Sequence, residues 1–193
     1  MTNNSTENIL HKPLAFAGVK HSGKSTFGKK VAHALHVQFA DSDELLLIQY
    51  NERNPSPFSN LRDLYREKGK EVFMEYEYLG ILHYFENISL PGILSLGGGI
   101  VDNVKAMNII KEKSFILYLD VPEEILYKRI ISKGIPPFLD SMHPKDHFSK
   151  IYNDRSERYM RDADIILNVG GLPIDESLSL IMQKILEEHN VWK

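Results

Sequence analysis

The sequence predicts a three-layer α/β/α fold, in which helices cover both faces of a five-stranded parallel sheet. Three observations predict it: five short apolar runs, helical segments between them, and a glycine-rich loop between the first run and the first helix. Strands buried on both faces read as continuous apolar runs, and helical crossovers between strands make the strands parallel. A chain of 193 residues is long enough for one domain with a substantial core, so we expect a single domain over residues 1–193.

Each expected strand is followed by a polar or helical segment. The apolar runs that predict strands are 13–17, 37–40, 93–96, 115–119 and 165–169. Helical spacing of apolar residues predicts helices at 26–35, 61–85, 123–132, 145–161 and 175–188. The second of these helices is expected to break near Gly69, because glycine is unfavourable inside a helix. Segments 51–59 and 134–144 contain several prolines and are expected to be loops.

A phosphate-binding loop follows the first expected strand. Residues 18–25 read Gly-Val-Lys-His-Ser-Gly-Lys-Ser and fit the pattern G-x-x-x-x-G-K-[ST] without a mismatch. In this pattern backbone N–H groups close around phosphate oxygens, Lys24 brings positive charge to the β and γ phosphates, and the Ser25 hydroxyl can bind Mg²⁺. The helix that follows adds its dipole to this anion site. The residues expected to contact the nucleotide are Gly18, Lys20, His21, Ser22, Gly23, Lys24, Ser25 and Thr26, with the His21 side chain facing outwards.

Two further motifs follow the second and third expected strands. Ligands of an open α/β sheet bind outside the carboxyl ends of its strands, so both motifs lie where a site would be. Asp41-Ser42-Asp43 offers one carboxylate for Mg²⁺ and one for an attacking hydroxyl, although a helix N-cap alone would also explain an aspartate there. Gly97-Gly98-Gly99 lacks Cβ atoms and lets another molecule approach the backbone, although a flexible connection would also explain it.

Composition and charge exclude several classes of function. The chain is 42% apolar and 25% charged, as in ordinary globular proteins, and no apolar run approaches the ~20 residues needed to cross a bilayer. It has no cysteine, which excludes disulfides and thiolate metal sites and agrees with a cytoplasmic location. Its net charge of −3 argues against a sequence-independent nucleic-acid binder. We expect a cytoplasmic monomer with no membrane or nucleic-acid partner.

The order and spacing of these motifs are similar to those of shikimate kinases. The resemblance extends from residue 13 to about residue 173 and rests on six segments of the chain. One of them, with Arg155, Tyr159, Ala163 and Asp164, resembles the R-x-x-x-Y-x-x-x-A-D segment of that family. The six segments are 18–25, 41–43, 61–65, 69–77, 95–99 and 155–164.

The resemblance implies a fold and an activity. The fold is a nucleoside monophosphate kinase-like fold with sheet order 2-3-1-4-5, substrate-binding helices within about 41–90, and a mobile lid at about 133–147. The activity is transfer of the γ-phosphoryl group of ATP to a hydroxyl of shikimate, which gives shikimate 3-phosphate, with Mg²⁺ as the metal. The partner it implies is therefore a small hydroxy acid.

On the donor side, the resemblance assigns roles to four residues. Lys24 would contact the transferring phosphate, Ser25 would bind Mg²⁺, and Asp41 would bind the Mg²⁺ shell through water. Arg129, near the end of an expected helix, looks like the arginine that packs on adenine in the family.

On the acceptor side, the resemblance assigns roles to five residues. Asp43 would contact the substrate hydroxyls and serve as the base. Gly98 and Gly99 would line the pocket with backbone N–H groups. Arg155 would bind the substrate carboxylate, and Glu77 would orient a second arginine.

The chain departs from the family pattern at two positions. The second arginine, three residues before the glutamate, is Met74 here, and Pro136 stands where the lid arginine would be. Methionine cannot form charge-assisted hydrogen bonds to a carboxylate, so its presence should weaken substrate binding by roughly 2–4 kcal/mol. Lys70 shares a helix face with Met74 and could compensate, although a solvated lysine is also expected there. The candidate replacement cations of the lid are Lys133, His143, Lys145 and His147.

Three functions agree with these residues. The first is a kinase that phosphorylates shikimate. The second is a kinase for a related hydroxylated acid or polyol, which Met74 favours. The third is a nucleotide-binding protein with little catalysis, which the presence of Lys24, Ser25, Asp41 and Asp43 argues against. A fold alone cannot fix a substrate.

Overall fold

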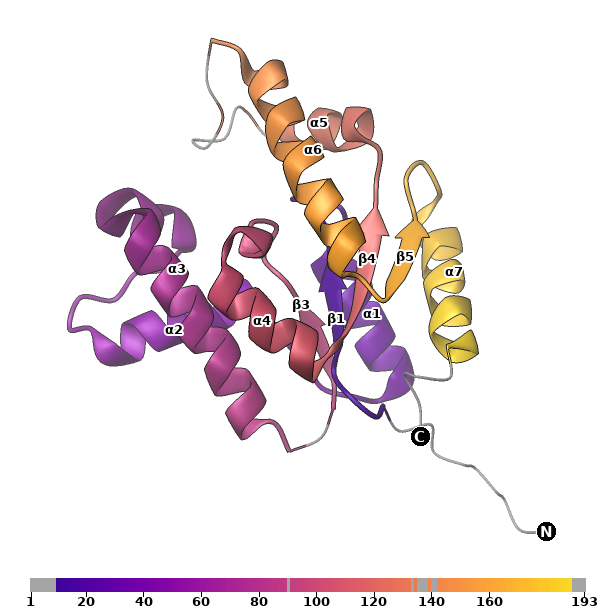
Figure 1. Cartoon of the computed structure of the whole chain (residues 1–193), viewed down its shortest axis with the longest axis horizontal. Helices are drawn as coiled ribbons and strands as arrows, with labels where there is room; N and C mark the ends of the chain where they lie inside the picture. The colour runs from indigo at the N-terminus through magenta and orange to yellow at the C-terminus, as the bar shows by residue number, and fades with distance from the viewer. Residues whose placement is uncertain (1–9, 90, 133, 135–138, 140–141, 189–193) are drawn as a thin grey trace.

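The structure is a computed structural model that describes residues 10–89, 91–132, 134, 139 and 142–188 (Figure 1). One or two helices separate each strand from the next. The strands are β1 (Leu14–Ala17), β2 (Phe39–Asp41), β3 (Ile93–Ser95), β4 (Phe115–Asp120) and β5 (Ile165–Asn168). The helices are α1 (Lys24–Leu35), α2 (Ser42–Arg53), α3 (Leu61–Asn87), the short 3-10 helix η1 (Ile100–Asp102), α4 (Val104–Lys113), α5 (Glu123–Ile131), α6 (Pro144–Asp162) and α7 (Ile174–Glu187).

The five strands form one parallel sheet in the order β2-β3-β1-β4-β5. Leu14 of the central strand β1 pairs with Ile93 of β3 on one side and with Phe115 of β4 on the other. The predicted parallel sheet and the strand order implied by the family resemblance are both confirmed. The order places the loop that follows β1 between the carboxyl ends of β3 and β4, where open α/β sheets bind ligands.

Alternate side chains of β1 enter two separate cores. Leu14 and Phe16 pack on the face covered by α1 and α7, together with Val31 and Ile181. Ala15 and Ala17 pack on the opposite face, which α3, α4 and α6 cover. In Figure 1, α4 and α6 lie in front of the sheet and α1 lies behind it. Both faces of β1 are therefore buried, which explains its continuous apolar sequence.

The structure differs from the sequence prediction in three elements. Helix α4, which begins after the N-cap Asn103, was not among the predicted helices. Helix α2 extends to Arg53, so the loop predicted at 51–59 is wrong at its start. Strand β5 is not buried on both faces: Ile166 is 48% exposed, because β5 is an edge strand with one side of its pleat towards solvent. The loop predicted at 134–144 lies largely outside the described residues.

The break predicted in the second long helix is confirmed. Gly69 has φ 80° and ψ 178° and interrupts α3. A positive φ of this size is accessible to glycine and costly for residues with a Cβ. The break turns the first part of α3, which packs beside α2, away from the axis of the second part (Figure 1).

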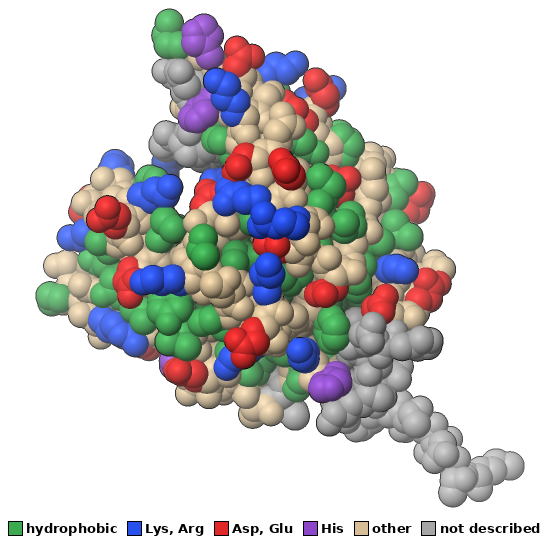
Figure 2. All heavy atoms as spheres, in the orientation of Figure 1, with side chains coloured by type: hydrophobic (Ala, Val, Ile, Leu, Met, Phe, Trp, Pro, Cys, Tyr) green, Lys and Arg blue, Asp and Glu red, His purple; other side chains and the backbone are tan. Residues whose placement is uncertain are grey.

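Basic and acidic side chains are interspersed over the face shown in Figure 2. This agrees with the near balance of 23 basic and 26 acidic residues in the sequence. Within the described ranges, no helix is both long and apolar enough to cross a membrane.

Candidate active site

The three sequence motifs meet at the carboxyl edge of the sheet. The phosphate-binding loop follows β1, Asp41 ends β2, and Gly97 to Gly99 follow β3. These strands are neighbours, and Asp41 is in register with Ser95 of β3. A parallel sheet therefore brings together segments that are more than 50 residues apart in the sequence.

Lys24 lies in the centre of the phosphate-binding loop. Its Nζ donates a hydrogen bond of 3.1 Å to the backbone oxygen of Val19, and the side chain is buried. Burial lowers the pKa of this ammonium group to about 8, while the carboxylates of Asp43 and Asp41 act against the shift. Gly23 and His21 have positive φ angles of 100° and 68°, which curve the loop around the helix N-terminus. Lys24 is thus a buried cation whose charge depends on neighbouring anions.

Ser25 and Asp41 form an oxygen cluster beside this loop. The Ser25 hydroxyl donates to Asp41 Oδ2 at 2.7 Å and lies 3.0 Å from the hydroxyl of Ser95. Hydroxyl and carboxylate oxygens are the ligand types that Mg²⁺ takes, directly or through water. The three side chains fit a magnesium ion next to bound phosphate. Ser95 was missed from the sequence, although its place at the end of an expected strand was a signal.

Asp41 and Asp43 have different positions. Asp41 Oδ1 accepts a hydrogen bond of 3.0 Å from the backbone N–H of Asp43, so Asp41 is also the N-cap of α2. Asp43 is exposed, and its Oδ1 lies against the backbone of Gly97, which shields part of the carboxyl from water. This partial removal from water, with the charge of Asp41, raises the pKa of the Asp43 carboxyl above its usual range, and Lys24 opposes the shift. The N-cap explanation and the site explanation therefore both apply to this motif.

Each glycine of the triplet makes room for a different part of the protein. A Cβ atom on Gly97 would lie 2.5 Å from Asp43 Oδ1, and one on Gly98 would lie 2.8 Å from the backbone nitrogen of Lys20. A Cβ on Gly99 would lie 3.2 Å from Arg155 Nη2. The sequence predicted close approach by another molecule. In the structure the base candidate, the phosphate-binding loop and the acceptor-side arginine all approach the triplet.

Helix α6 is fastened to this glycine triplet by two of its side chains. The Tyr159 hydroxyl donates to the backbone oxygen of Gly97 at 3.2 Å, and its ring stacks on Tyr118. Arg155 donates to the oxygen of Gly98 at 3.4 Å and forms an ion pair of 2.8 Å with Asp102. Arg155 therefore lies beside the glycine triplet, where Asp102 balances part of its charge.

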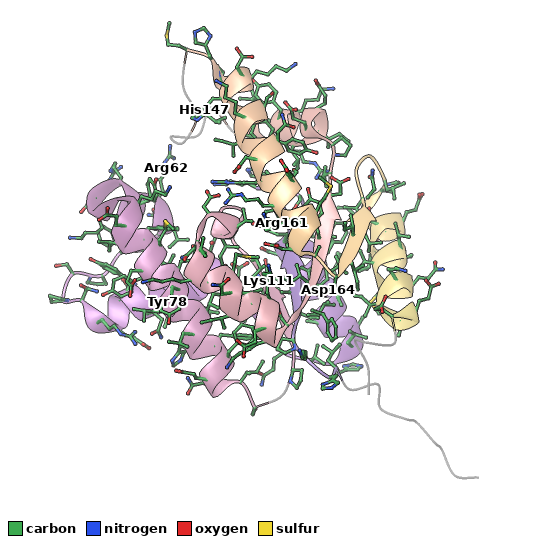
Figure 3. The ribbon with its side chains drawn as sticks, viewed as in Figure 1. Arg62, Tyr78, Lys111, His147, Arg161 and Asp164 are labelled. Atoms are coloured by element: carbon green, nitrogen blue, oxygen red, sulfur yellow. The ribbon has the colours of Figure 1, made fainter. Side chains whose placement is uncertain are left out.

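The rest of the segment that resembles the family has a structural role. Asp164 Oδ2 accepts a hydrogen bond of 2.8 Å from the backbone N–H of Ile116, so it fixes the start of β5 beside β4. Asp162 accepts bonds of 3.0 Å from Lys111 of α4 and from Arg161 of α6. Figure 3 labels Lys111, Arg161 and Asp164 from this group, which come from α4, α6 and the residue before β5.

Glu77 is buried beside the acceptor side of the site. Its Oε2 accepts a hydrogen bond of 2.9 Å from Asn103 Nδ2, and the same amide donates to the backbone oxygen of Met74 at 2.7 Å. Burial raises the pKa of Glu77 to about 7; the Asn103 hydrogen bond opposes this, and Asp43 adds to it. The implied role of Glu77, orienting an arginine at position 74, does not apply. Its partner is Asn103, which was missed from the sequence.

Arg129 and the lid cations complete the predicted set. Arg129 Nη1 donates to the backbone oxygen of His21 at 3.0 Å, which places its guanidinium beside the phosphate-binding loop. Lys145 pairs with Glu124 at 3.4 Å. Figure 3 places His147 of α6 and Arg62 of α3 on opposite sides of the space between these helices. Lys70 is exposed, as a solvated lysine would be. Lys133 and Pro136 lie outside the described residues, as do five other residues of the predicted lid.

Comparisons with known proteins agree with this architecture. A family model described as shikimate kinase matches residues 20–188. The shikimate kinase of Clostridium beijerinckii is 32% identical over 161 residues, which cover 82% of this chain and 86% of that protein. The shikimate kinase of Corynebacterium glutamicum is 29% identical over 172 residues, which cover 89% of this chain and 95% of that protein.

Solved structures show the same fold. The shikimate kinase of Acinetobacter baumannii in complex with shikimate matches with a TM-score of 0.77 and 20% identity, over 91% of this chain and 93% of that one. The shikimate kinase of Bacteroides thetaiotaomicron matches with a TM-score of 0.74 and 23% identity, over 92% of this chain and 99% of that one.

Proposed function

The chain belongs to the shikimate kinase family, and on that premise we propose that it transfers the γ-phosphoryl group of ATP to a hydroxyl of shikimate. The products are shikimate 3-phosphate and ADP. The observation that carries the proposal is the position of Lys24 in the phosphate-binding loop and of Asp43 beside Gly97 at the same sheet edge, where the charge of each shifts the pKa of the other. A buried cation serves the donor there, and a carboxylate with a raised pKa serves the acceptor.

The donor side holds the phosphates. The backbone of the loop at 18–25 and Lys24 bind the β and γ phosphates, and Arg129 lies where it can cover the base. Ser25 and Asp41, with Ser95 nearby, would hold Mg²⁺, which when bound would supply positive charge to the phosphate oxygens. Lys24 Nζ donates a hydrogen bond to the backbone oxygen of Val19. A bound phosphate would give this ammonium group an anionic partner instead.

The acceptor side supplies the base. Asp43 lies beside Gly97 and within the electrostatic influence of Lys24. As the acceptor hydroxyl oxygen bonds to the γ phosphorus and the bond to ADP breaks, the hydroxyl proton passes to the Asp43 carboxylate. The raised pKa of Asp43 makes its carboxylate a better proton acceptor than an ordinary aspartate near neutral pH.

Arg155 binds the acceptor carboxylate. Its guanidinium is held against the glycine triplet by Gly98 and Asp102, which fixes its orientation. A fixed guanidinium offers a carboxylate two parallel hydrogen bonds. Position 74, which would supply a second arginine, holds a methionine, so we expect weaker acceptor binding than two arginines would give.

An acceptor panel tests the proposal. ADP release is measured with ATP and Mg²⁺ in the presence of shikimate, quinate or gluconate. We expect turnover with shikimate above that with the other two. Turnover with gluconate or quinate alone would favour the second function, a kinase for a related hydroxy acid, for which Met74 is the favouring observation. ATP binding without any turnover would contradict both.

A further inference from the structure

Glu77 is a buried acid beside the acceptor side, and the phosphoryl transfer described above gives it no task. We propose that Glu77, held by Asn103, is a specificity-determining residue that is a neutral acid while the acceptor binds. An acceptor carboxylate is then bound more tightly below neutral pH than above it. The inference rests on the proposed function, because it concerns the carboxylate of the acceptor.

The hydrogen bonds of Asn103 fix the direction of its amide. Asn103 Oδ1 accepts from the backbone N–H of Ala106 at 3.3 Å, as the N-cap of α4. Its Nδ2 therefore faces the other way and donates to both Glu77 Oε2 and the backbone oxygen of Met74. All three contacts use the amide as its chemistry requires, so Asn103 can offer Glu77 only a neutral donor.

Glu77 is 5% exposed, and within the described part of the chain it forms no ion pair. The groups that face it are Asp43 of α2, Asp102 of η1, and Arg155 and Tyr159 of α6. Arg155 is already paired with Asp102. A buried carboxyl with one amide donor and two nearby acids favours the protonated form.

Helix α4 also packs against α3, but its Lys105 side chain contacts Glu75 and not Glu77. Lys105 of α4 lies 3.6 Å from Glu75, and both side chains are more than half exposed. Glu75 is two residues from Glu77 on α3 and faces away from the core. It is therefore a matched control for Glu77.

The charge state of Glu77 bears on acceptor binding because Arg155, which would bind the acceptor carboxylate, also acts electrostatically on Glu77. A neutral Glu77 can donate its O–H and leaves the positive charge of Arg155 to the acceptor carboxylate. An ionised Glu77 competes for that charge and repels the carboxylate. Two like charges a few ångströms apart in a protein site change affinity by about tenfold or more.

The test is the KM for shikimate between pH 5.5 and 8.5 in wild type, Glu77→Gln and Glu75→Gln. Glutamine copies the shape of a neutral glutamic acid at every pH. We expect the wild-type KM for shikimate to rise about tenfold through pH 7 relative to that of Glu77→Gln. The ratio of the two proteins' KM values for ATP should stay the same at each pH. Glu75→Gln should follow wild type. Lys24 and Asp43 also titrate, so the variants are compared at each pH.

Equal pH dependence of the shikimate KM in wild type and Glu77→Gln would overturn the proposal. Infrared spectroscopy gives a second readout that needs no substrate. A carboxylic acid C=O band should be present at pH 5.5, disappear near pH 7, and be absent in Glu77→Gln. An ionised Glu77 at pH 5.5 would overturn the proposal even in an active enzyme. A band that titrates as expected in a protein that never turns over shikimate would instead contradict the proposed function.

Discussion

At the scale of single residues, removal from water shifts the pKa values of Lys24 and Asp43 in opposite directions. It lowers the pKa of Lys24 and raises that of Asp43, because it disfavours the charged form of both. Each charge is retained because the other lies nearby, and bound phosphate and Mg²⁺ would add further partners. Removing either group therefore changes the other, and double variants of this pair should not be additive.

Replacing Met74 by arginine should increase the affinity for shikimate. In Met74→Arg, a guanidinium three residues before Glu77 on the same helix face can pair with Glu77 and bind the acceptor carboxylate. The KM for shikimate at pH 8 should fall by about tenfold or more, since a charge-assisted bidentate contact contributes roughly 2–4 kcal/mol. Steady-state kinetics would measure it.

The control for that variant is Glu75→Gln, which changes the net charge by the same amount on the exposed face of α3. It should leave the KM for shikimate within about twofold of wild type, because exposed charges contribute little. An unchanged KM in Met74→Arg would mean that position 74 does not face the acceptor.

At the scale of elements, the glycine triplet after β3 joins α2, α6 and the loop that follows β1. Ser42 Oγ accepts from the backbone N–H of Gly97 at 2.7 Å, while Tyr159 and Arg155 donate to the oxygens of the triplet. The donor loop, the base and the acceptor arginine therefore share one rigid support. Such a support keeps reacting groups in place without further ordering when substrates bind.

Gly98→Ala tests this support. The added Cβ would meet the backbone nitrogen and Cα of Lys20 at 2.8 and 3.0 Å, and backbone atoms cannot move aside as a flexible side chain can. The phosphate-binding loop should shift, so we expect kcat/KM for ATP to fall at least about a hundredfold. Isothermal calorimetry would show weaker nucleotide binding.

Gly69→Ala is the control for a general loss of stability. A Cβ on Gly69 meets no atom within 4 Å, but its φ of 80° makes the substitution strained. It should lower the free energy of unfolding by roughly 1 kcal/mol and leave the KM for ATP unchanged. Equal effects of the two variants on nucleotide binding would argue against a site role for Gly98.

At the scale of the whole molecule, Glu77 makes stability depend on pH. Its pKa rises from an ordinary 4.5 to about 7 on folding, so the folded protein keeps a proton that the unfolded chain loses first. Stability due to Glu77 is full below pH 4.5, falls as the pH rises to 7, and stays low above that. The loss is of the order of 3 kcal/mol.

Glu77→Gln should remove this loss. Urea unfolding at pH 5 and pH 8 would measure the free energy of unfolding in both proteins. From pH 5 to pH 8, the free energy of unfolding of the variant should increase relative to that of wild type by up to about 3 kcal/mol, because glutamine carries no titrating proton. The same difference between variant and wild type at both pH values would mean that Glu77 does not titrate in this range.

Much of the fold could be predicted from the sequence because the inner strands β1, β3 and β4 are buried on both faces and read as apolar runs. Edge strand β5 was predicted in position but not in burial, since exposure of Ile166 follows from the sheet order. Helix α4 was missed although Asn103 and the apolar residues 106, 107 and 110 carry a helix signal. Only η1 and the N-cap Asn103 separate α4 from the glycine triplet, and no long apolar run marks its start.

The site was predicted where its chemistry lies within one local motif. The loop with Lys24 and the Asp41-Ser42-Asp43 motif each occupy a few consecutive residues. The contacts that were missed join distant segments: Asn103 with Glu77 across 26 residues, Asp102 with Arg155 across 53, and Ser95 with Ser25 across 70. Such pairs depend on the sheet order and on helix packing, which a single sequence does not specify.

The most direct test of the account is the rate of shikimate 3-phosphate formation by wild type and Asp43→Asn at saturating ATP and Mg²⁺. Asparagine has the shape of aspartate but cannot take up the hydroxyl proton. We expect product with wild type, and in the variant a kcat lower by about 10²–10⁴-fold with ATP affinity within a few-fold of wild type. Equal losses of rate and ATP affinity, or a rate that is unchanged, would contradict the assignment of Asp43 as the base at this sheet edge.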